Sequence, residues 1–180
     1  MQERKAEISR VTGETNVHIS LDLDGTGKAQ IHTGIGFFDH MLNSFARHGL
    51  FDLTVDVQGD LEVDSHHTIE DTGIVLGQAI RQAVGDKKGI RRFGDCMLPM
   101  DETLMLCALD LSGRPYLKFY MPLTVPKVGD FDTEMVHEFF YAVSYGAEMN
   151  LHLKMLDGEN NHHIIEAAFK AFAKALDQAT

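Results

Sequence analysis

The chain of 180 residues lacks the features that mark membrane, secreted and nucleic-acid-binding proteins. It has no apolar run of the roughly 18 residues that a membrane-spanning helix needs, so no such helix is expected. Residues 1–7 are too charged for the apolar core of a signal peptide, which predicts a cytoplasmic location. Basic residues number 16 against 27 acidic ones, and the net charge of -11 argues against a nucleic-acid partner.

Cysteine is scarce as well. Only Cys96 and Cys107 occur, and both lie among apolar residues. Neither stands in a sequence context that would activate a thiol. We therefore expect two buried thiols, and neither a disulfide nor a catalytic nucleophile.

A motif of histidine and glutamate occurs twice, in residues 66–70 and 162–166, and each copy opens a segment with helical apolar periodicity. Residues four apart share one face of a helix, so His66 with Glu70, and His162 with Glu166, can each bind one cation. The adjacent His67 and His163 point about 100° away and should reach other ions. Two copies predict two metal sites, each completed by residues of the opposite copy.

The alternative is that each pair of histidines merely lies at a helix start, where side chains can cap free N–H groups. Capping does not require the same spacing twice, so the repetition favours metal binding.

The two motifs belong to a longer duplication. Apolar residues alternate as in a strand at 53–57 and again at 151–155, each time before the motif, and helices are expected at about 38–49 and 133–148. We predict an α+β fold of two similar halves, 1–92 and 93–180, forming one compact unit. Each half would be a mainly antiparallel, mixed sheet with two helices packed on one face.

Turn residues predict the connections between strands. Asp24-Gly25 predicts a hairpin from the strand at 17–23 to residues 28–33, and Gly49 is expected to end the first helix. Residues 112–115 form a turn between strands at 104–111 and 116–120, and 122–130 should be irregular.

The duplication also predicts further metal ligands. His40 falls opposite Glu138 in the register of the two halves, so both are candidates. His137 competes with Glu138, because imidazole is the commoner ligand for transition metals. A ligand set of imidazole and carboxylate without thiolate is typical of a five- or six-coordinate site for manganese, iron or zinc. It is not typical of a structural zinc site, which uses cysteine.

A few charged residues complete the candidate site. Glu14 is a candidate for proton transfer, although a glutamate at a strand end is usually only solvated. The pair Arg91-Arg92, with Arg114 and Lys170, could clamp a phosphate, whereas each residue alone is more typical of a surface charge.

Four segments, 36–42, 64–71, 112–115 and 161–172, resemble the imidazoleglycerol-phosphate dehydratase family of histidine biosynthesis, and the likeness runs from Arg10 to about Leu176. It implies a hydro-lyase that converts imidazoleglycerol phosphate to imidazole acetol phosphate. It also implies two manganese ions per active site, with other divalent transition metals as alternatives, and sites at subunit contacts of a 24-subunit shell. The substrate ring would bind as an imidazolate, and metal charge would stabilise a diazafulvene-like intermediate.

The resemblance assigns roles by position in this sequence. The catalytic residues it implies are Glu14, His67 and Glu166. The substrate or phosphate contacts it implies are Glu14, His40, His48, Arg92, Arg114 and Lys170. The metal ligands it implies are His40, His66, His67, Glu70, Glu138, His162, His163 and Glu166.

Two departures from the family pattern affect these expectations. Family members often have histidine where this chain has Glu138, so this ligand is either a carboxylate or is replaced by His137. The family commonly continues into a Ser-Lys-Gly-type tail that helps to hold the phosphate, whereas this sequence ends at Thr180. We expect weaker phosphate binding without such a tail, and an unchanged Michaelis constant after appending it would contradict this.

Two other functions use the same ligands. A metal-stabilised assembly protein would join subunits through the doubled motif without turnover, but it would not need Glu14, Arg92, Arg114 and Lys170. A binuclear hydrolase of phosphate esters would use the metals to activate water, and would release inorganic phosphate.

Overall fold

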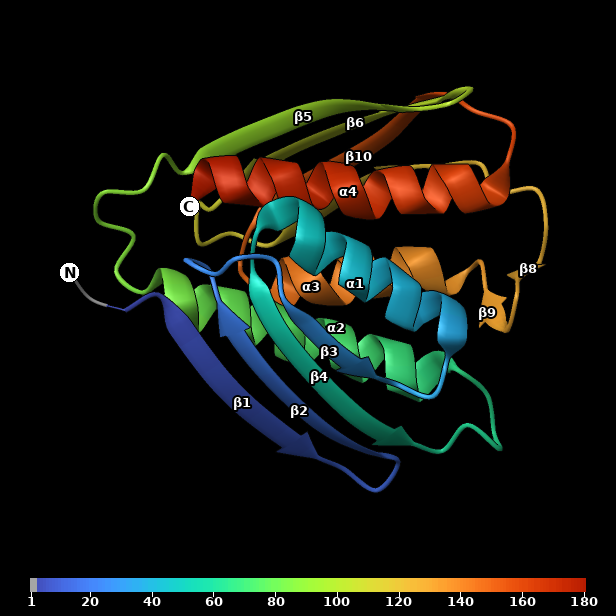
Figure 1. The fold of residues 1–180 in the computed structure, drawn as a ribbon, viewed down its shortest axis with the longest axis horizontal. Helices are drawn as coiled ribbons and strands as arrows, with labels where there is room; N and C mark the ends of the chain where they lie inside the picture. Colours follow the sequence, from blue (N-terminus) through green and yellow to red (C-terminus); the bar gives the residue numbers. More distant parts are fainter. Residues whose placement is uncertain (1–2) are drawn as a thin grey trace.

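The computed structural model describes residues 3–180, in which two four-stranded sheets enclose a layer of helices (Figure 1). The first half contains β1 (Lys5–Val11), β2 (Thr15–Asp22), β3 (Ala29–His32), α1 (Gly36–Gly49), β4 (Asp52–Gly59) and α2 (His66–Val84). The second half contains β5 (Phe93–Met100), β6 (Thr103–Asp110), β7 (Tyr116–Tyr120), β8 (Lys127–Val128), β9 (Phe131–Asp132), α3 (Met135–Gly146), β10 (Asn150–Asp157) and α4 (Asn161–Ala179).

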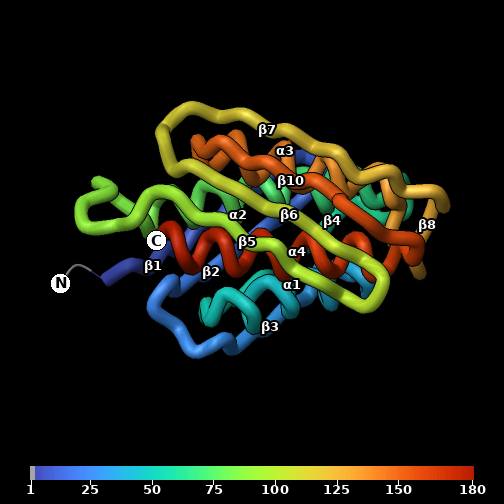
Figure 2. Tube along the Cα trace, turned by 90° about the horizontal axis from the view of Figure 1, so that it is seen from above, coloured from blue at the N-terminus to red at the C-terminus, as the bar shows by residue number. Residues whose placement is uncertain are grey.

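The two sheets have the same strand order. The first runs β1-β2-β4-β3 and the second β5-β6-β10-β7, and in each the last pair is parallel while the others are antiparallel. Alternation explains the central strands, since every second residue of β2 and β6 is buried against the helices. The predicted α+β class with two similar mixed sheets is confirmed. Figure 2 shows the second sheet lying across the helices.

The predicted hairpin at Asp24-Gly25 is wrong. β2 pairs with β1 and β4, whereas β3 pairs with β4 alone and in parallel. The backbone N–H groups of Thr26 and Lys28 donate to the Asp52 carboxylate at 2.7 and 3.0 Å, so the turn is held at the start of β4. The segment therefore crosses over β4 and closes no two-stranded ladder.

The edge strands β1 and β5 were not expected from the sequence. β1 carries the charged residues Lys5 and Glu7 at exposed positions, and β5 contains a glycine and a proline, so both depart from a strong strand pattern. The turn at 112–115 connects β6 and β7, as the sequence predicted, and these two strands lie on either side of β10.

Four helices form the layer between the sheets. α2 covers β1 and β2, α4 covers β5 and β6, and the halves meet where α2 packs against α3 and α1 against α4. All four helices begin at the same end of the molecule, beside the β1–β2 and β5–β6 turns (Figure 1). This arrangement brings both histidine motifs to one end. No helix within residues 3–180 combines the length and apolar character needed to cross a bilayer.

Phenylalanine rings join three of the helices. Phe139 of α3 stacks on Phe169 of α4 with centroids 5.1 Å apart, and Phe45 of α1 stacks on Phe172 of α4 at 5.3 Å. The rings are fully buried and supply a large apolar area to the core. They fix the position of α1 on α4, which the candidate site requires.

α1 ends at Gly49, as the sequence predicted, but this glycine is not the residue with a left-handed conformation at the helix end. Leu50 has the positive φ of 59° at the helix end. A Cβ on Gly49 would lie 2.1 Å from Cε2 of Phe51, so glycine is needed for this close approach.

The contact between α2 and α3 uses glycine in place of aromatic rings. A Cβ on Gly77 would lie 2.5 Å from the Val143 carbonyl oxygen and 2.9 Å from the Gly146 Cα. Both neighbours are backbone atoms, which cannot rotate away. The two helices therefore approach as closely as they do only because these positions lack a side chain.

Gly77→Ala should destabilise the protein by roughly 1–3 kcal/mol, because overpacking outweighs the better helix propensity of alanine. Gly13→Ala is the control, since no atom lies within 4 Å of its added Cβ. Urea unfolding of both variants at equal concentration checks this. A Gly77→Ala variant as stable as the unchanged chain would contradict the close helix contact.

Candidate metal centre

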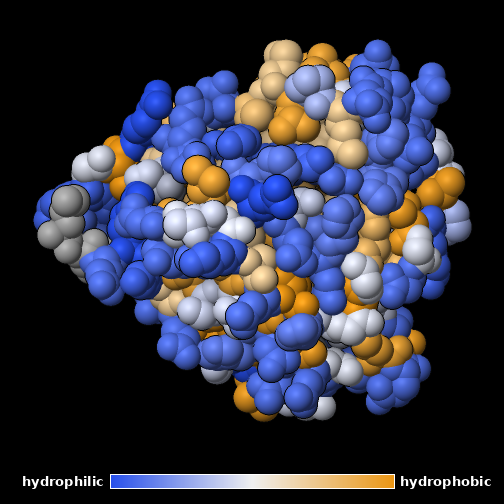
Figure 3. Space-filling view, in the orientation of Figure 1, coloured by the Kyte–Doolittle hydropathy of each residue, from blue (hydrophilic) through white to orange (hydrophobic). Residues whose placement is uncertain are grey.

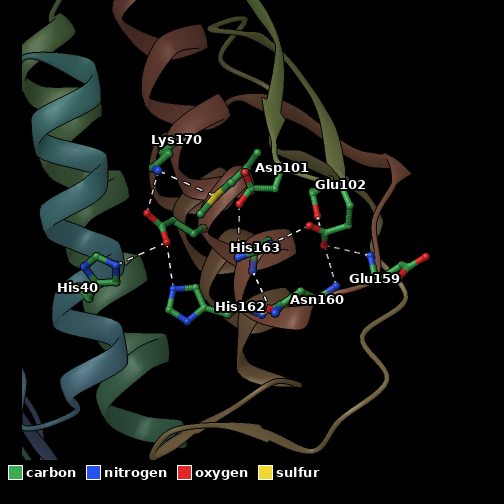
Figure 4. Close-up of polar contacts among 11 residues, drawn as sticks. His40, Asp101, Glu102, Glu159, Asn160, His162, His163 and Lys170 are labelled. Atoms are coloured by element: carbon green, nitrogen blue, oxygen red, sulfur yellow. Dashed lines mark hydrogen bonds and ion pairs between the residues drawn. The ribbon is translucent and has the colours of Figure 1, made fainter.

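Three side chains meet where α1 packs against α4. His40 comes from α1, and His162 and Glu166 lie one turn apart on α4. Their potential ligand atoms all lie within 4.8 Å of one another, with Glu166 Oε2 3.0 Å from His162 Nε2 and 3.5 Å from His40 Nε2 (Figure 4). Two imidazoles and one carboxylate converging in this way suit a divalent transition ion.

Glu166 is the buried member of this cluster. Its side chain is 9% exposed, and Lys170, one turn further along α4, donates to Oε1 at 2.8 Å. Burial acts to raise the pKa of Glu166, but the hydrogen bond and charge of Lys170, followed by the charge of His40, bring it below its ordinary value. The carboxylate is therefore ionised, as a metal ligand must be.

The local sequence explains why α4 begins at the motif. The Asn160 side chain accepts hydrogen bonds from the backbone N–H groups of His162 and His163 at 2.9 and 3.3 Å. This N-cap satisfies donors that the first helical turn leaves free. At α2 the Asp64 carboxylate plays a similar part, accepting from the His66 N–H at 2.7 Å.

The first half forms a looser version of the cluster. His66 Nε2 lies 3.6 Å from Glu70 Oε2, while Glu138 of α3 accepts a hydrogen bond from His137 Nδ1 at 3.0 Å. Among the described residues, only His40, His162 and Glu166 form a group of three that converges on one point. Glu138 and His137 are thus in mutual contact, and which of them binds metal stays a prediction.

His67 and His163 each pair with a carboxylate outside the motifs. Asp60, just after β4, lies 2.9 Å from His67 Nδ1, and Glu102, in the β5–β6 turn, lies 2.8 Å from His163 Nδ1. These hydrogen bonds raise the pKa of both histidines. Neither acid was predicted from the sequence. Only Glu102 had a signal there, because Glu14 and Glu102 each precede the threonine that begins a matching strand.

Glu14 lies exposed at the β1–β2 turn, at the end where all four helices begin. Thr12 Oγ1 accepts hydrogen bonds from the N–H groups of Glu14 and Thr15, and the Thr15 hydroxyl donates to Asp71 of α2. The turn is therefore anchored to the helix that carries His66 and His67. The charge of Glu14 contributes to the raised pKa of His67, so the two side chains lie near one another.

The predicted phosphate contacts do not meet within one chain. Lys170 lies at the cluster, but Arg92 and Arg114 lie beyond the opposite end of the second sheet. The eight-residue strand β5 separates the two ends by roughly 25 Å. Arg92 is held there by Asp110, with its Nε and Nη2 atoms 2.7 and 3.1 Å from the two carboxylate oxygens.

His48 lies two turns beyond His40 on α1 and is half-buried. Burial, followed by the charges of Lys170 and Lys174, lowers its pKa. The ring is therefore neutral near neutral pH, which suits a pocket residue that donates one hydrogen bond and accepts another.

Together, the fold and this site define an internally duplicated α+β protein with a candidate centre for divalent transition ions. Residues 33–176 match the family model described as "Imidazoleglycerol-phosphate dehydratase". The chain belongs to the imidazoleglycerol-phosphate dehydratase family, a family of hydro-lyases in histidine biosynthesis. The resemblance stated from the sequence is thus confirmed.

Named relatives cover nearly the whole chain. The imidazoleglycerol-phosphate dehydratase of Lachnoclostridium phytofermentans is 68% identical over 98% of this chain and 90% of its own length. That of Acetivibrio thermocellus is 62% identical over 99% and 91%. The crystal structure of the Staphylococcus aureus enzyme superposes with a TM-score of 0.88 at 43% identity, over 97% of each chain.

Glu166→Gln should remove the divalent ion from the cluster, because a neutral amide replaces the buried charged ligand. Asp177→Asn, at an exposed position of the same helix, is the matched control. Bound manganese, measured by elemental analysis after dialysis against the metal, should fall in the first variant alone. Full manganese content in folded Glu166→Gln would exclude Glu166 as a ligand.

Proposed function

We propose that this chain dehydrates imidazoleglycerol phosphate to imidazole acetol phosphate at a site with two manganese ions, other divalent transition metals being alternatives. The converging His40, His162 and Glu166 are the observation that carries the proposal, together with the family to which the chain belongs. A hydro-lyase of this kind must remove a carbon-bound proton and a hydroxide without any change in redox state. Imidazole and carboxylate ligands fit such a role because they can hold divalent ions whose positive charge stabilises developing negative charge.

The donor set of the chain fits the metals. His40, His162 and Glu166 would hold one ion, and His66, Glu70 and Glu138 would hold the other, with His67 and His163 reaching ions outside their own clusters. When bound, the metals would supply positive charge that stabilises the deprotonated imidazole ring of the substrate.

Glu14 is proposed as the group that moves a proton at the substrate. Its carboxylate is exposed and makes no hydrogen bond or ion pair with the other residues that the structure describes. Its turn is nevertheless anchored through Thr15 and Asp71, so the carboxylate is held near His67 and is open to a ligand. Proton transfer of this kind typically contributes about 10²–10⁴-fold to the rate. Glu166 and His67 would act with Glu14 at the same site.

Self-association would complete the site. Arg92 and Arg114 lie roughly 25 Å from the cluster that contains Lys170, so one phosphate can touch all three only if two copies contribute. The surface in Figure 3 carries hydrophobic patches among hydrophilic residues. Exposed large hydrophobic residues on the second sheet include Phe93, Met97, Tyr116 and Tyr120. These features support a large homo-oligomer, a 24-mer by family resemblance, with sites between subunits.

The proposed location is the cytoplasm, and no nucleic acid or membrane is a proposed partner. Cys96 and Cys107 are free cysteines, as is usual in a reducing compartment. The acidic net charge of -11 disfavours binding to polyanions.

Metal-stripped protein should turn over imidazoleglycerol phosphate only after manganese is added, and should release no inorganic phosphate. Glu14→Gln should retain manganese and assembly but lose about 10²–10⁴-fold in kcat. Ketone formation and phosphate release are followed in the same reaction, with subunit assembly measured by light scattering.

Phosphate release would favour a hydrolase, and an assembled, metal-loaded protein without turnover would favour an assembly protein. Either outcome would contradict the proposed dehydratase, and near-normal turnover of Glu14→Gln would remove Glu14 from the mechanism.

A further inference from the structure

The two duplicated histidines that point away from their own clusters share one arrangement. His67 Nδ1 and His163 Nδ1 each meet a carboxylate oxygen, at 2.9 and 2.8 Å. The carboxylates come from segments that the duplication does not relate, since Asp60 follows β4 and Glu102 precedes β6. The duplication alone therefore does not explain why both Nδ1 atoms have a carboxylate as their partner.

Glu102 is bound through both of its carboxylate oxygens (Figure 4). Oε1 accepts from the backbone N–H groups of Asn160 and Glu159, at 2.8 and 3.3 Å, and from the Thr103 hydroxyl at 3.0 Å. Oε2 accepts from His163 Nδ1. The hydrogen bond to His163, followed by the Asn160 N–H, holds the pKa of Glu102 well below its ordinary range. Four donors therefore face the two oxygens of Glu102, an arrangement that suits an ionised carboxylate.

The duplication makes Glu102 the counterpart of Glu14. Each precedes a buried threonine, Thr15 or Thr103, that begins a matching strand, β2 or β6. The carboxylate of Glu14 is free among the described residues, whereas Glu102 bridges the β5–β6 turn to the start of α4. Glu14 is therefore exposed to solvent, whereas Glu102 is hydrogen-bonded to His163.

A neutral imidazole carries its proton on one nitrogen and a lone pair on the other. An ionised carboxylate only accepts hydrogen bonds, so it places the proton on the nitrogen that faces it. In His163 that nitrogen is Nδ1, and Nε2 lies on the other side of the ring, 3.9 Å from Asp101 Oδ2. The contact with Glu102 is a hydrogen bond, whereas the contact with Asp101 is too long for one, so the lone pair lies on Nε2, directed away from Glu102.

We propose that Glu102 is a positioning residue that keeps the His163 proton on Nδ1, so that Nε2 presents its lone pair to a divalent ion outside the His40 cluster. The presence of this ion depends on the proposed function, whereas the position of the His163 proton does not. An orienting acceptor of this kind typically affects metal affinity by about 10- to 100-fold.

Glu102→Gln tests this proposal by replacing one carboxylate oxygen with an NH₂ group. The side-chain amide has one oxygen, which the backbone N–H groups of Asn160 and Glu159 require at the Oε1 position. The NH₂ group then falls at the Oε2 position and donates to His163 Nδ1. The ring proton must move to Nε2, where the metal would bind, while the contacts that hold the turn to α4 remain. Glu159→Gln is the matched control, because Glu159 lies in the same loop and only its backbone N–H contacts Glu102.

Imidazole ¹⁵N shifts of the metal-free oligomer, at a pH where the ring is neutral and with His163→Gln as the assignment reference, report the tautomer. The unchanged chain and Glu159→Gln should show His163 protonated on Nδ1, and Glu102→Gln should show it protonated on Nε2. Manganese titration should show one class of sites weakened by about 10- to 100-fold in Glu102→Gln alone.

A His163 protonated on Nε2 in the unchanged chain, or on Nδ1 in folded Glu102→Gln, would overturn the proposal. So would equal manganese affinity in folded Glu102→Gln and Glu159→Gln. Because the tautomer is read without metal or substrate, its result stands apart from the test of dehydratase activity. If Glu102→Gln does not fold, Glu102→Asp, which keeps an acceptor, should retain the Nδ1 proton, and loss of that proton would count against the proposal.

Discussion

The candidate site depends on one buried charge, the Glu166 carboxylate between α1 and α4. An ionised group in such a place is stable only with partners, and removing one partner of a buried pair typically costs about 3–5 kcal/mol. Lys170 binds one oxygen, and the imidazoles of His162 and His40 approach the other. The aromatic packing of Phe45 on Phe172 fixes α1 on α4 and thereby brings His40 to a charge carried by α4. The packing of the core therefore also positions the three candidate ligands.

Duplication supplied the histidine and glutamate motif twice, and the two copies have diverged in how their helices are packed. The strand orders agree, yet Phe rings fill the contact between α1 and α4, whereas Gly77 and Gly146 allow the contact between α2 and α3. The acids at the two β-turns have also diverged, since Glu14 is free and Glu102 is bound at both oxygens. The duplicated fold thus has the histidine and glutamate motif twice, whereas of the two turn glutamates only Glu14 has a carboxylate that no described residue binds.

Local patterns predicted the parts of the molecule that depend on neighbours in sequence. Spacing of four residues placed His162 with Glu166, and alternation located β4 and β10. The pairing of segments that are distant in the sequence could not be predicted from such local patterns. The Asp24-Gly25 turn was predicted to be a hairpin because no local pattern indicates that the Asp52 carboxylate accepts hydrogen bonds from the N–H groups that follow it. Likewise, no pattern around Asp60 indicated that it is the partner of His67. The distance between Arg92 and Lys170 likewise follows from strand direction, which composition and motifs do not encode.

The central claim is that the His40, His162 and Glu166 side chains hold a divalent ion. Crystals of the manganese-loaded protein, measured on both sides of the manganese absorption edge, test it most directly. We expect an anomalous difference peak within coordinating distance of all three side chains, from an ion bound through His40 Nε2, His162 Nε2 and Glu166 Oε2. A fully loaded crystal with manganese elsewhere and no peak at this cluster would contradict it.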